Sequence, residues 1–144
     1  PYNRSSDFFN KNIRDYEYKA IVDLALDALD YDDIVLLNAP FTQEVRDAAY
    51  MDGLRARLVP KHARLVIIWI DAASEVCRKR MEQRQSDRDT WKLTHWEQYL
   101  KTTSFEPPSS IDDPHDKHDL LLFHNSTQHE FRESMARVLP ILEK

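Results

Sequence analysis

The chain has 144 residues, of which 42% are hydrophobic and 31% charged, and its formal net charge is −5. This length predicts one domain with one core over residues 1–144, and the composition excludes a disordered chain. No apolar run is long enough to cross a membrane, no signal-peptide pattern opens the chain, and the acidic total disfavours a general nucleic-acid binder.

The first half of the chain predicts two helices around a strand. Asn12 is placed to cap a helix that runs to about residue 29, with apolar residues at helical spacing. The run at 33–37, DIVLL, is apolar on both faces and predicts a buried strand. A helix is expected over 42–58, with Gly53 unfavourable in its middle.

The second half predicts two more strands, each followed by helical sequence. The expected strands are 64–71 and 119–125, which are again apolar on both faces. The expected helices are one capped by Ser74 that runs to Arg84, one over 89–101, and one opened by the capping-box pair Thr127 and Glu130. Residues 104–118 are proline-rich and predict an irregular loop.

Strands that are apolar on both faces and alternate with helices indicate the α/β class, a parallel sheet covered by helices on both sides in three layers. In such sheets, ligands bind beyond the carboxyl ends of the strands. The predicted strands end at Asn38, at Asp71 and at His124 and Asn125. A binding site is therefore expected at this edge, although such residues also cap turns without any function.

A cationic segment follows the middle strand by one helix. Residues 78–92 hold six cations and three acids, a local charge of +3, which leaves −8 for the rest of the −5 total. Arginines at 80, 84 and 88 are spaced along one helical face and its extension. The pattern suits a small anionic ligand, because the guanidinium fork binds two phosphate oxygens, and it also suits a solvated helix face with internal ion pairs.

Four stretches together resemble the P-loop kinase superfamily, in its branch of small ATP-binding proteins of the AAA or zeta-toxin type. They are IVLLNAPF, WIDAASEVCRKRMEQR, RQSDRDTWKLTHWEQY and PHDKHDLLLFHNS. The resemblance covers about residues 33–130 and implies a P-loop NTPase-like sheet, with residues 84–103 as a mobile lid. It implies binding of ATP with Mg²⁺ and phosphoryl transfer to a small-molecule acceptor.

The resemblance also implies roles for individual residues. The catalytic candidates are Arg80, Arg84, Arg88 and Asp71, and the cofactor-binding candidates are Asn38, Arg84, Arg88 and Asn125. The arginines would neutralise the charge that spreads over the phosphoryl oxygens, and Asp87 and Asp89 would hold them in place. No protein ligand for the metal is predicted.

Two features depart from the family pattern. With one glycine, Gly53, the sequence has no glycine-rich phosphate loop, so we expect the first strand and that loop to belong to a preceding segment of a longer protein. Asn38 stands where the family usually has Asp, and an amide cannot take a proton from a substrate hydroxyl. As this 144-residue stretch alone, the chain is expected to be inactive.

Other residues have alternative interpretations. Trp91 and Trp96 are expected to anchor the lid rather than stack on a base, and Cys77, the lone cysteine, is expected to be buried in a protein of the reducing cytoplasm. Arg4, Arg14 and Tyr16 either contact the acceptor or are structural. His115 and His118 lie among aspartates in a proline-interrupted loop, whereas a zinc site usually needs ligands held by rigid elements, so no physiological metal site is favoured there.

Three functions are compatible with these patterns. The first is a kinase-like phosphotransferase, and the second is a non-catalytic nucleotide-binding or regulatory protein of the same fold, which Asn38 permits. The third, a 5′-hydroxyl polynucleotide kinase, needs a basic groove beyond the lid, and the −8 charge outside residues 78–92 argues against it.

Overall fold

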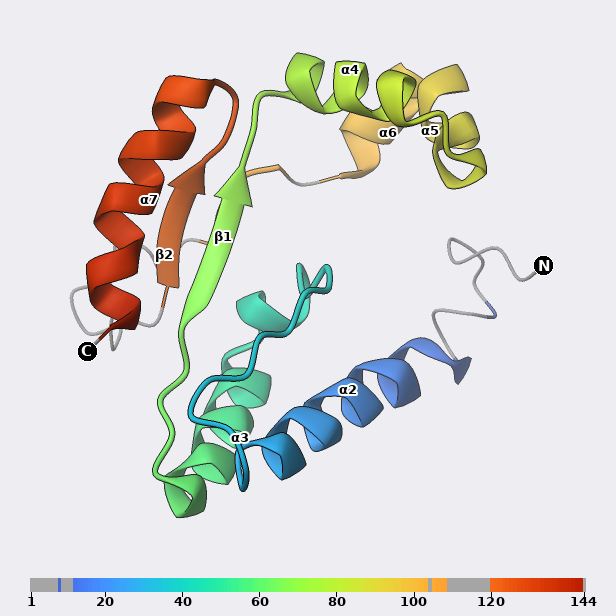
Figure 1. Cartoon of the computed structure of the whole chain (residues 1–144). Coiled ribbons are helices and arrows are strands. Elements are labelled where there is room, and N and C mark those ends of the chain that lie inside the picture. The colour runs from blue at the N-terminus through green and yellow to red at the C-terminus, as the bar shows by residue number, and fades with distance from the viewer. Residues whose placement is uncertain (1–7, 9–11, 104, 109–119, 144) are drawn as a thin grey trace. The chain divides into compact units, whose positions relative to one another are not determined.

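A computed structural model of the chain describes Phe8 and residues 12–103, 105–108 and 120–143. The chain divides into two compact units, Pro1–Leu65 and Val66–Lys144 (Figure 1). The described residues are mostly helical and contain a two-stranded parallel sheet. Across these residues, every helix is too short or too polar to serve as a membrane span.

The first unit is built on two helices, α2 (Arg14–Ala28) and α3 (Ala48–Leu58). Short 3₁₀ helices η1 (Glu44–Arg46) and η2 (Val59–Lys61) flank α3. Val22 and Leu26, one turn apart on α2, are buried with Leu58 of α3 and form the core of this unit. The apolar spacing that predicted α2 is confirmed, but Asn12 does not cap it, because Ile13 precedes the helix and makes no side-chain capping bond.

The expected helix over 42–58 is interrupted at Asp47. This residue adopts an extended conformation, and its Oδ1 accepts hydrogen bonds from the backbone N–H groups of Ala49 and Tyr50 at 2.9 and 3.2 Å. A capping carboxylate that satisfies the first free N–H groups starts a new helix rather than continuing the old one. The region is therefore η1 followed by α3.

The expected strand over residues 33–37 is wrong. The segment is neither strand nor helix, and Ile34 and Leu36 are 71% and 81% exposed. A strand that is apolar on both faces is stable only with pairing partners and covering helices, and the described residues of its unit supply no strand. The two later strands are confirmed, so parallel α/β organisation holds for a sheet of two strands instead of three.

That sheet consists of β1 (Ile67–Asp71) and β2 (Leu120–His124) in the second unit. The strands run parallel, with Ile67 beside Leu120 and Asp71 beside His124 (Figure 1). Helix α7 (Gln128–Leu142) packs along β2, where Phe131 meets the buried Phe123 edge to face at 5.5 Å. The predicted capping box of Thr127 and Glu130 is present at the start of α7.

Along the chain, β1 and β2 are separated by a helical segment that begins with α4 (Ser74–Arg84). Ala73, not Ser74, occupies the capping position, and its N–H donates to Ser126 Oγ at 2.8 Å. Gln85 ends α4 in the left-handed conformation with φ of 50°. The prediction that this helix ends at Arg84 is thus confirmed.

The segment that was expected to be a lid, residues 84–103, is called the lid segment below and contains η3 (Asp87–Asp89), α5 (Thr90–Thr94) and α6 (Trp96–Thr102). A single helix over 89–101 was expected, but His95 leaves the helical region with φ −120° and ψ 42° and separates α5 from α6. The break turns Trp96 inward, where it is buried, while Trp91 stays half-exposed and stacks on His95 at 5.1 Å. The anchoring role is therefore confirmed for Trp96 only.

Candidate functional site

The carboxyl ends of β1 and β2 bring a group of polar residues together. Asp71 and His124 are the last residues of the two strands and lie side by side in the register. His124 Nδ1 is 3.0 Å from Asp71 Oδ2, with the side chains 43% and 36% exposed. The next residue, Asn125, donates its backbone N–H to the Asp71 carbonyl at 2.8 Å, which extends the pairing past the strand ends.

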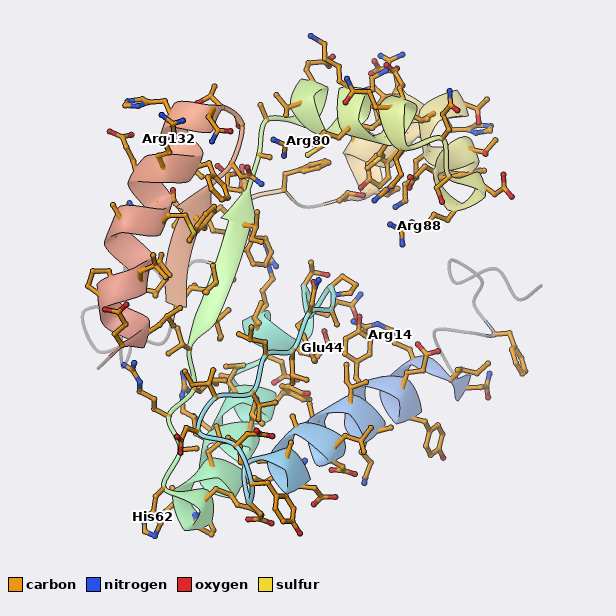
Figure 2. The ribbon with its side chains drawn as sticks, in the orientation of Figure 1. Arg14, Glu44, His62, Arg80, Arg88 and Arg132 are labelled. Atoms are coloured by element: carbon orange, nitrogen blue, oxygen red, sulfur yellow. The ribbon has the colours of Figure 1, made fainter. Side chains whose placement is uncertain are left out.

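Arg80 connects helix α4 to this edge. Its Nη2 donates to the Asn125 carbonyl at 2.8 Å, and the residue is exposed (Figure 2). The contact spans 45 residues of sequence, and the Ala73–Ser126 hydrogen bond reinforces it. Three residues predicted for the site, Asp71, Arg80 and Asn125, are therefore neighbours at the carboxyl edge.

Arg84 is engaged in the lid. Its Nε and Nη2 both donate to Asp89 Oδ2, at 2.9 and 2.5 Å. Asp89 is fully buried, and Lys92 Nζ lies 3.9 Å from its other oxygen, Oδ1, which accepts no hydrogen bond from the described residues. The expectation that an acid in this segment holds a lid arginine is confirmed for Asp89. The remaining N–H groups of the half-exposed Arg84 guanidinium stay available for an anion.

Arg88 projects away from the lid. The side chain is exposed, and it makes no hydrogen bond or ion pair with any residue in the described ranges (Figure 2). An arginine that is not neutralised by a protein carboxylate keeps its full charge for a ligand. Of the three predicted arginines, Arg80 lies at the strand ends, Arg84 is held by an acid, and Arg88 is exposed on the lid.

Asn38 does not follow a strand, so the strand-end position expected for it is wrong. It belongs to the first unit and is exposed in the irregular stretch that follows residues 33–37. Its expected position depended on a strand that needs neighbours to form. Its part in cofactor binding stays a prediction.

Arg14, a candidate for the acceptor side, has a structural environment. It donates to Glu44 Oε1 at 2.6 Å and to Gln43 Oε1 at 2.8 Å, and its guanidinium lies over the Tyr18 ring at 4.8 Å (Figure 2). Burial is the main cause that raises the pKa of the nearby Tyr50 hydroxyl, and the negative charge of the Glu44 carboxylate raises this pKa further. Of the other acceptor candidates, Tyr16 is exposed and Arg4 lies outside the described residues.

Cys77 is half-buried rather than fully buried, and its Sγ lies 3.7 Å from the Ala72 carbonyl. Burial raises the pKa of its thiol, which keeps the unreactive protonated form at neutral pH. His115 and His118 lie outside the described residues, and within those residues no three His, Cys, Asp or Glu side chains are grouped as metal ligands.

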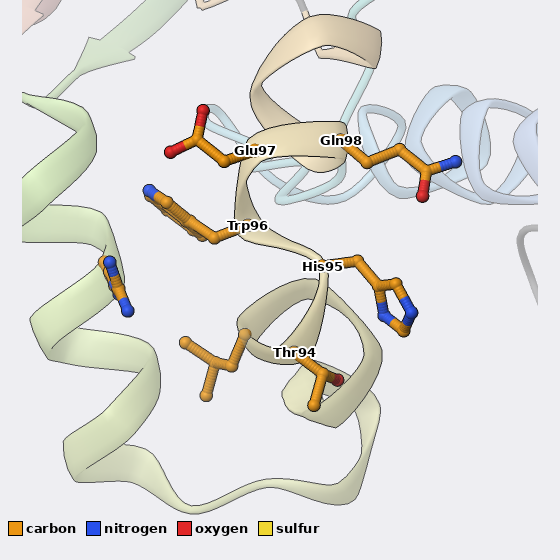
Figure 3. A pocket seen from close by; sticks show the side chains of 7 residues that line it. Thr94, His95, Trp96, Glu97 and Gln98 are labelled. Carbon is orange, nitrogen blue, oxygen red and sulfur yellow. The ribbon is translucent and has the colours of Figure 1, made fainter.

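A separate hollow of about 390 Å³ lies between α4 and the lid helices (Figure 3). It is lined by Arg78 and residues 93–98, and the Arg78 guanidinium lies over the buried Trp96 ring at 5.6 Å. Trp96 Nε1 has no hydrogen-bond partner among the described residues, but the atom itself is buried and cannot reach a ligand in the hollow. Arg78 is also paired with Glu82 at 3.2 Å, so this hollow offers less chemistry than the strand ends do.

The residue that sequence reasoning left without a role is His124. It was placed at a strand end, but its pairing with Asp71 depends on the strand register, which the sequence does not fix. The sequence feature that could have indicated this pair was the presence of an ionisable residue at the end of each of these two predicted strands.

Comparison of the chain with protein-family models, with curated proteins and with solved structures found no match, so the functional inference depends on the geometry of its own residues.

Proposed function

We propose that this protein binds ATP at the carboxyl edge of β1 and β2 and transfers a phosphoryl group to a small-molecule acceptor. The observation that supports this best is the hydrogen bond from Arg80 to the Asn125 carbonyl, which joins the cationic helix α4 to the strand ends. Parallel strands direct their carboxyl ends toward bound ligands in open α/β sheets, and Arg80 would meet phosphate oxygens there. The P-loop kinase fold in three layers is part of the same proposal.

The lid would act by adding charge. Arg84 is oriented by the buried Asp89, and Arg88 is exposed, so both can approach a triphosphate as the lid closes. Phosphoryl transfer needs mainly positioning and neutralisation of the charge on the non-bridging oxygens. Mg²⁺ would enter with the nucleotide phosphates. Among the described residues, no three His, Cys, Asp or Glu side chains are grouped so that they could hold this ion.

A second candidate function is nucleotide binding without catalysis. It is favoured by the Arg84–Asp89 ion pair, because Asp89 already neutralises an arginine that a kinase would use on the phosphate. Calorimetry with ATP and with a non-hydrolysable analogue, followed by a phosphate-release assay, separates the two functions. Binding without turnover in the natural polypeptide, including any residues that precede Pro1, supports this second function. No binding of either nucleotide contradicts both.

The Arg88→Ala variant tests the phosphotransferase directly. Turnover is expected to fall at least tenfold, which corresponds to about 1.4 kcal/mol of barrier, because a charge aimed at the transferred phosphoryl group is lost. Lys79→Ala is the matched control, since Lys79 is an exposed cation on α4 outside the proposed site. Equal turnover in the two variants would remove Arg88 from the catalytic residues.

A further inference from the structure

The Asp71–His124 contact determines which nitrogen of the imidazole carries the proton. An ionised carboxylate only accepts hydrogen bonds, so His124 Nδ1, 3.0 Å from Asp71 Oδ2, must be the donor. In the neutral ring, the lone pair then lies on Nε2. Within the part of the chain that the structure describes, Nε2 has no hydrogen-bond partner, and an imidazole with a carboxylate on Nδ1 and an unpaired Nε2 has the arrangement of a general base.

The ring is fixed by elements of regular structure. His124 ends β2, its backbone N–H donates to the buried Ser134 Oγ of α7 at 2.9 Å, and Ser134 Oγ lies 3.2 Å from the His124 carbonyl. The side chain itself remains 43% exposed. Its backbone is therefore held while the side chain stays partly exposed, as proton transfer to a substrate requires.

Charged residues from each neighbouring element surround this ring. Asp71 comes from β1, and Arg80 of α4 reaches the adjacent Asn125 carbonyl. On α7, the pKa of the Glu130 carboxyl is lowered mainly by the backbone hydrogen bond from Thr127 and to a smaller extent by the nearby His124. Asp71 accepts the Nδ1 proton of the imidazole, and the arginine offers a place for a phosphate. A proton acceptor and an anion-binding group thus lie at one edge of the sheet.

We propose that Asp71 and His124 form an acid–base dyad in which His124 Nε2 takes the proton from the acceptor hydroxyl. This inference rests on the proposed function. In the step, the hydroxyl oxygen forms a bond to the γ-phosphorus, the bond to the β-phosphate oxygen breaks, and ADP leaves with that electron pair. The hydroxyl proton passes to Nε2. Asp71 is a positioning residue, because it holds the ring in the required tautomer without touching the substrate.

The chain contains its own control histidine. His129 on α7 pairs with Glu133 through Nε2, at 3.3 Å, on the exposed outer surface of the helix. An exposed imidazole prefers the Nε2–H tautomer, so we expect His129 to carry its proton on the opposite nitrogen, and it lies outside the proposed site. His124 and His129 are expected to give opposite tautomer signatures in one spectrum.

Nitrogen-15 NMR of the imidazole rings tests the positioning role without any assay of activity. In the unmodified protein, neutral His124 is expected as the Nδ1–H tautomer and His129 as the Nε2–H tautomer. In Asp71→Ala, His124 should change to the Nε2–H form that free imidazoles in peptides prefer, and His129 should not change. An Nε2–H tautomer of His124 in the unmodified protein would overturn the proposal.

Kinetics test the proton transfer. His124→Ala should lower kcat about a hundredfold, the lower end of what general base catalysis contributes, with the KM for ATP within about twofold. Added imidazole should restore part of this kcat, and His129→Ala should leave it unchanged. Turnover of His124→Ala equal to that of the unmodified protein overturns the dyad alone. These assays use the natural polypeptide, including any residues that precede Pro1, and absence of turnover in it overturns the proposed phosphotransferase, and the dyad with it.

Discussion

Glu44 is a buried acid whose charge is compensated by an ion pair with one arginine, Arg14. Its Oε1 pairs with Arg14 at 2.6 Å, while Oε2 is buried and accepts no hydrogen bond from the described residues. The pair joins the start of α2 to η1, and Tyr18 extends the contact by donating its hydroxyl to the Pro40 carbonyl at 3.0 Å. A buried charge that depends on one partner makes both residues sensitive to substitution.

Arg14→Ala is expected to destabilise the protein by about 3 kcal/mol, because Glu44 would be left buried and uncompensated. The free energy of unfolding in urea measures this change. Lys19→Ala, which breaks the exposed Lys19–Asp23 pair, should cost much less, because exposed ion pairs contribute little to stability, and it serves as the control. The double variant Arg14→Met with Glu44→Leu should be more stable than Arg14→Ala. A loss in Arg14→Ala no larger than in Lys19→Ala would contradict the buried-pair interpretation.

The carboxyl of Glu130 makes the stability of the protein depend on pH. Its Oε2 accepts the backbone N–H groups of Thr127 and Ser126 at 2.9 and 2.8 Å, and the bond from Thr127 is the main cause that lowers the pKa of its carboxyl below the usual 4.5. A carboxyl whose pKa is lowered by folding adds stability above the unfolded value. That stability is lost as the pH falls from 4.5 through the folded-state value.

The variant Glu130→Gln should therefore be less stable than the unmodified protein at pH 7, and the difference should shrink as the pH is lowered below 4.5. Urea unfolding at a series of pH values from 7 to about 3 measures the difference. Other carboxyls titrate equally in both proteins and cancel. A difference that stays constant over this range would show that the charge of Glu130 has no part in the cap.

Among the elements, α3 contains the lone glycine at a position that does not need it. Gly53 lies in the helix interior with a negative φ, and a Cβ built on it meets no atom within 4 Å. Glycine in a helix costs conformational entropy that alanine does not. Neither a close contact nor a left-handed conformation explains its presence.

Gly53→Ala is accordingly expected to stabilise the protein by about 0.5–1 kcal/mol. Thermal and urea unfolding give the shift. The reverse change in the same helix, Ala56→Gly at an exposed position, should destabilise by a similar amount. A loss of stability in Gly53→Ala would mean that the local backbone of α3 differs from a regular helix.

The elements that sequence reasoning predicted well are those with strong local signals. Helix α7 has a capping box and an apolar stripe, and β1 and β2 are short apolar runs that pair with each other. Residues 33–37 carry the same apolar pattern as the two strands and still do not form one, because strand formation needs a partner and residue type does not supply it. The break at His95 also has no proline or glycine to mark it.

The site was predictable to the extent that it follows from strand ends. Asp71, Arg80 and Asn125 meet as expected, because parallel strands bring their carboxyl ends together and α4 begins at that edge. An acid at 87 or 89 was expected to hold an arginine of this segment, and the structure shows Asp89 holding Arg84. Asn38 was misplaced together with its strand, and the Asp71–His124 contact needed the register, which is a property of two segments far apart in the chain.

At the scale of the whole molecule, the described surface carries large apolar side chains. Tyr31, Ile34 and Leu36 are all more than two-thirds exposed within six residues. Exposed apolar groups that are this close in sequence favour association between molecules, whereas single ones are ordinary. The net charge of −5 opposes association by mutual repulsion.

We expect Leu36→Lys to raise the protein concentration at which light scattering increases. Leu24→Lys is the matched control, since Leu24 is also exposed but is eight residues from Tyr16, the other large apolar residue that is exposed on α2, and both changes alter the net charge by the same amount. The gain should be larger for Leu36→Lys. Equal effects of the two substitutions would assign the change to charge and not to the apolar cluster.

The alignment of β1 with β2 has a consequence for how the folding of the second unit can be followed. Since Asp71 and His124 are cross-strand partners, sliding one strand by a single residue would set Asp71 opposite an aromatic or an amide instead of the imidazole. The tautomer of the His124 imidazole therefore reports the register of the two strands. A refolding experiment that follows this imidazole would distinguish molecules with the native register from molecules with a shifted register, although the helix content of both would be nearly the same.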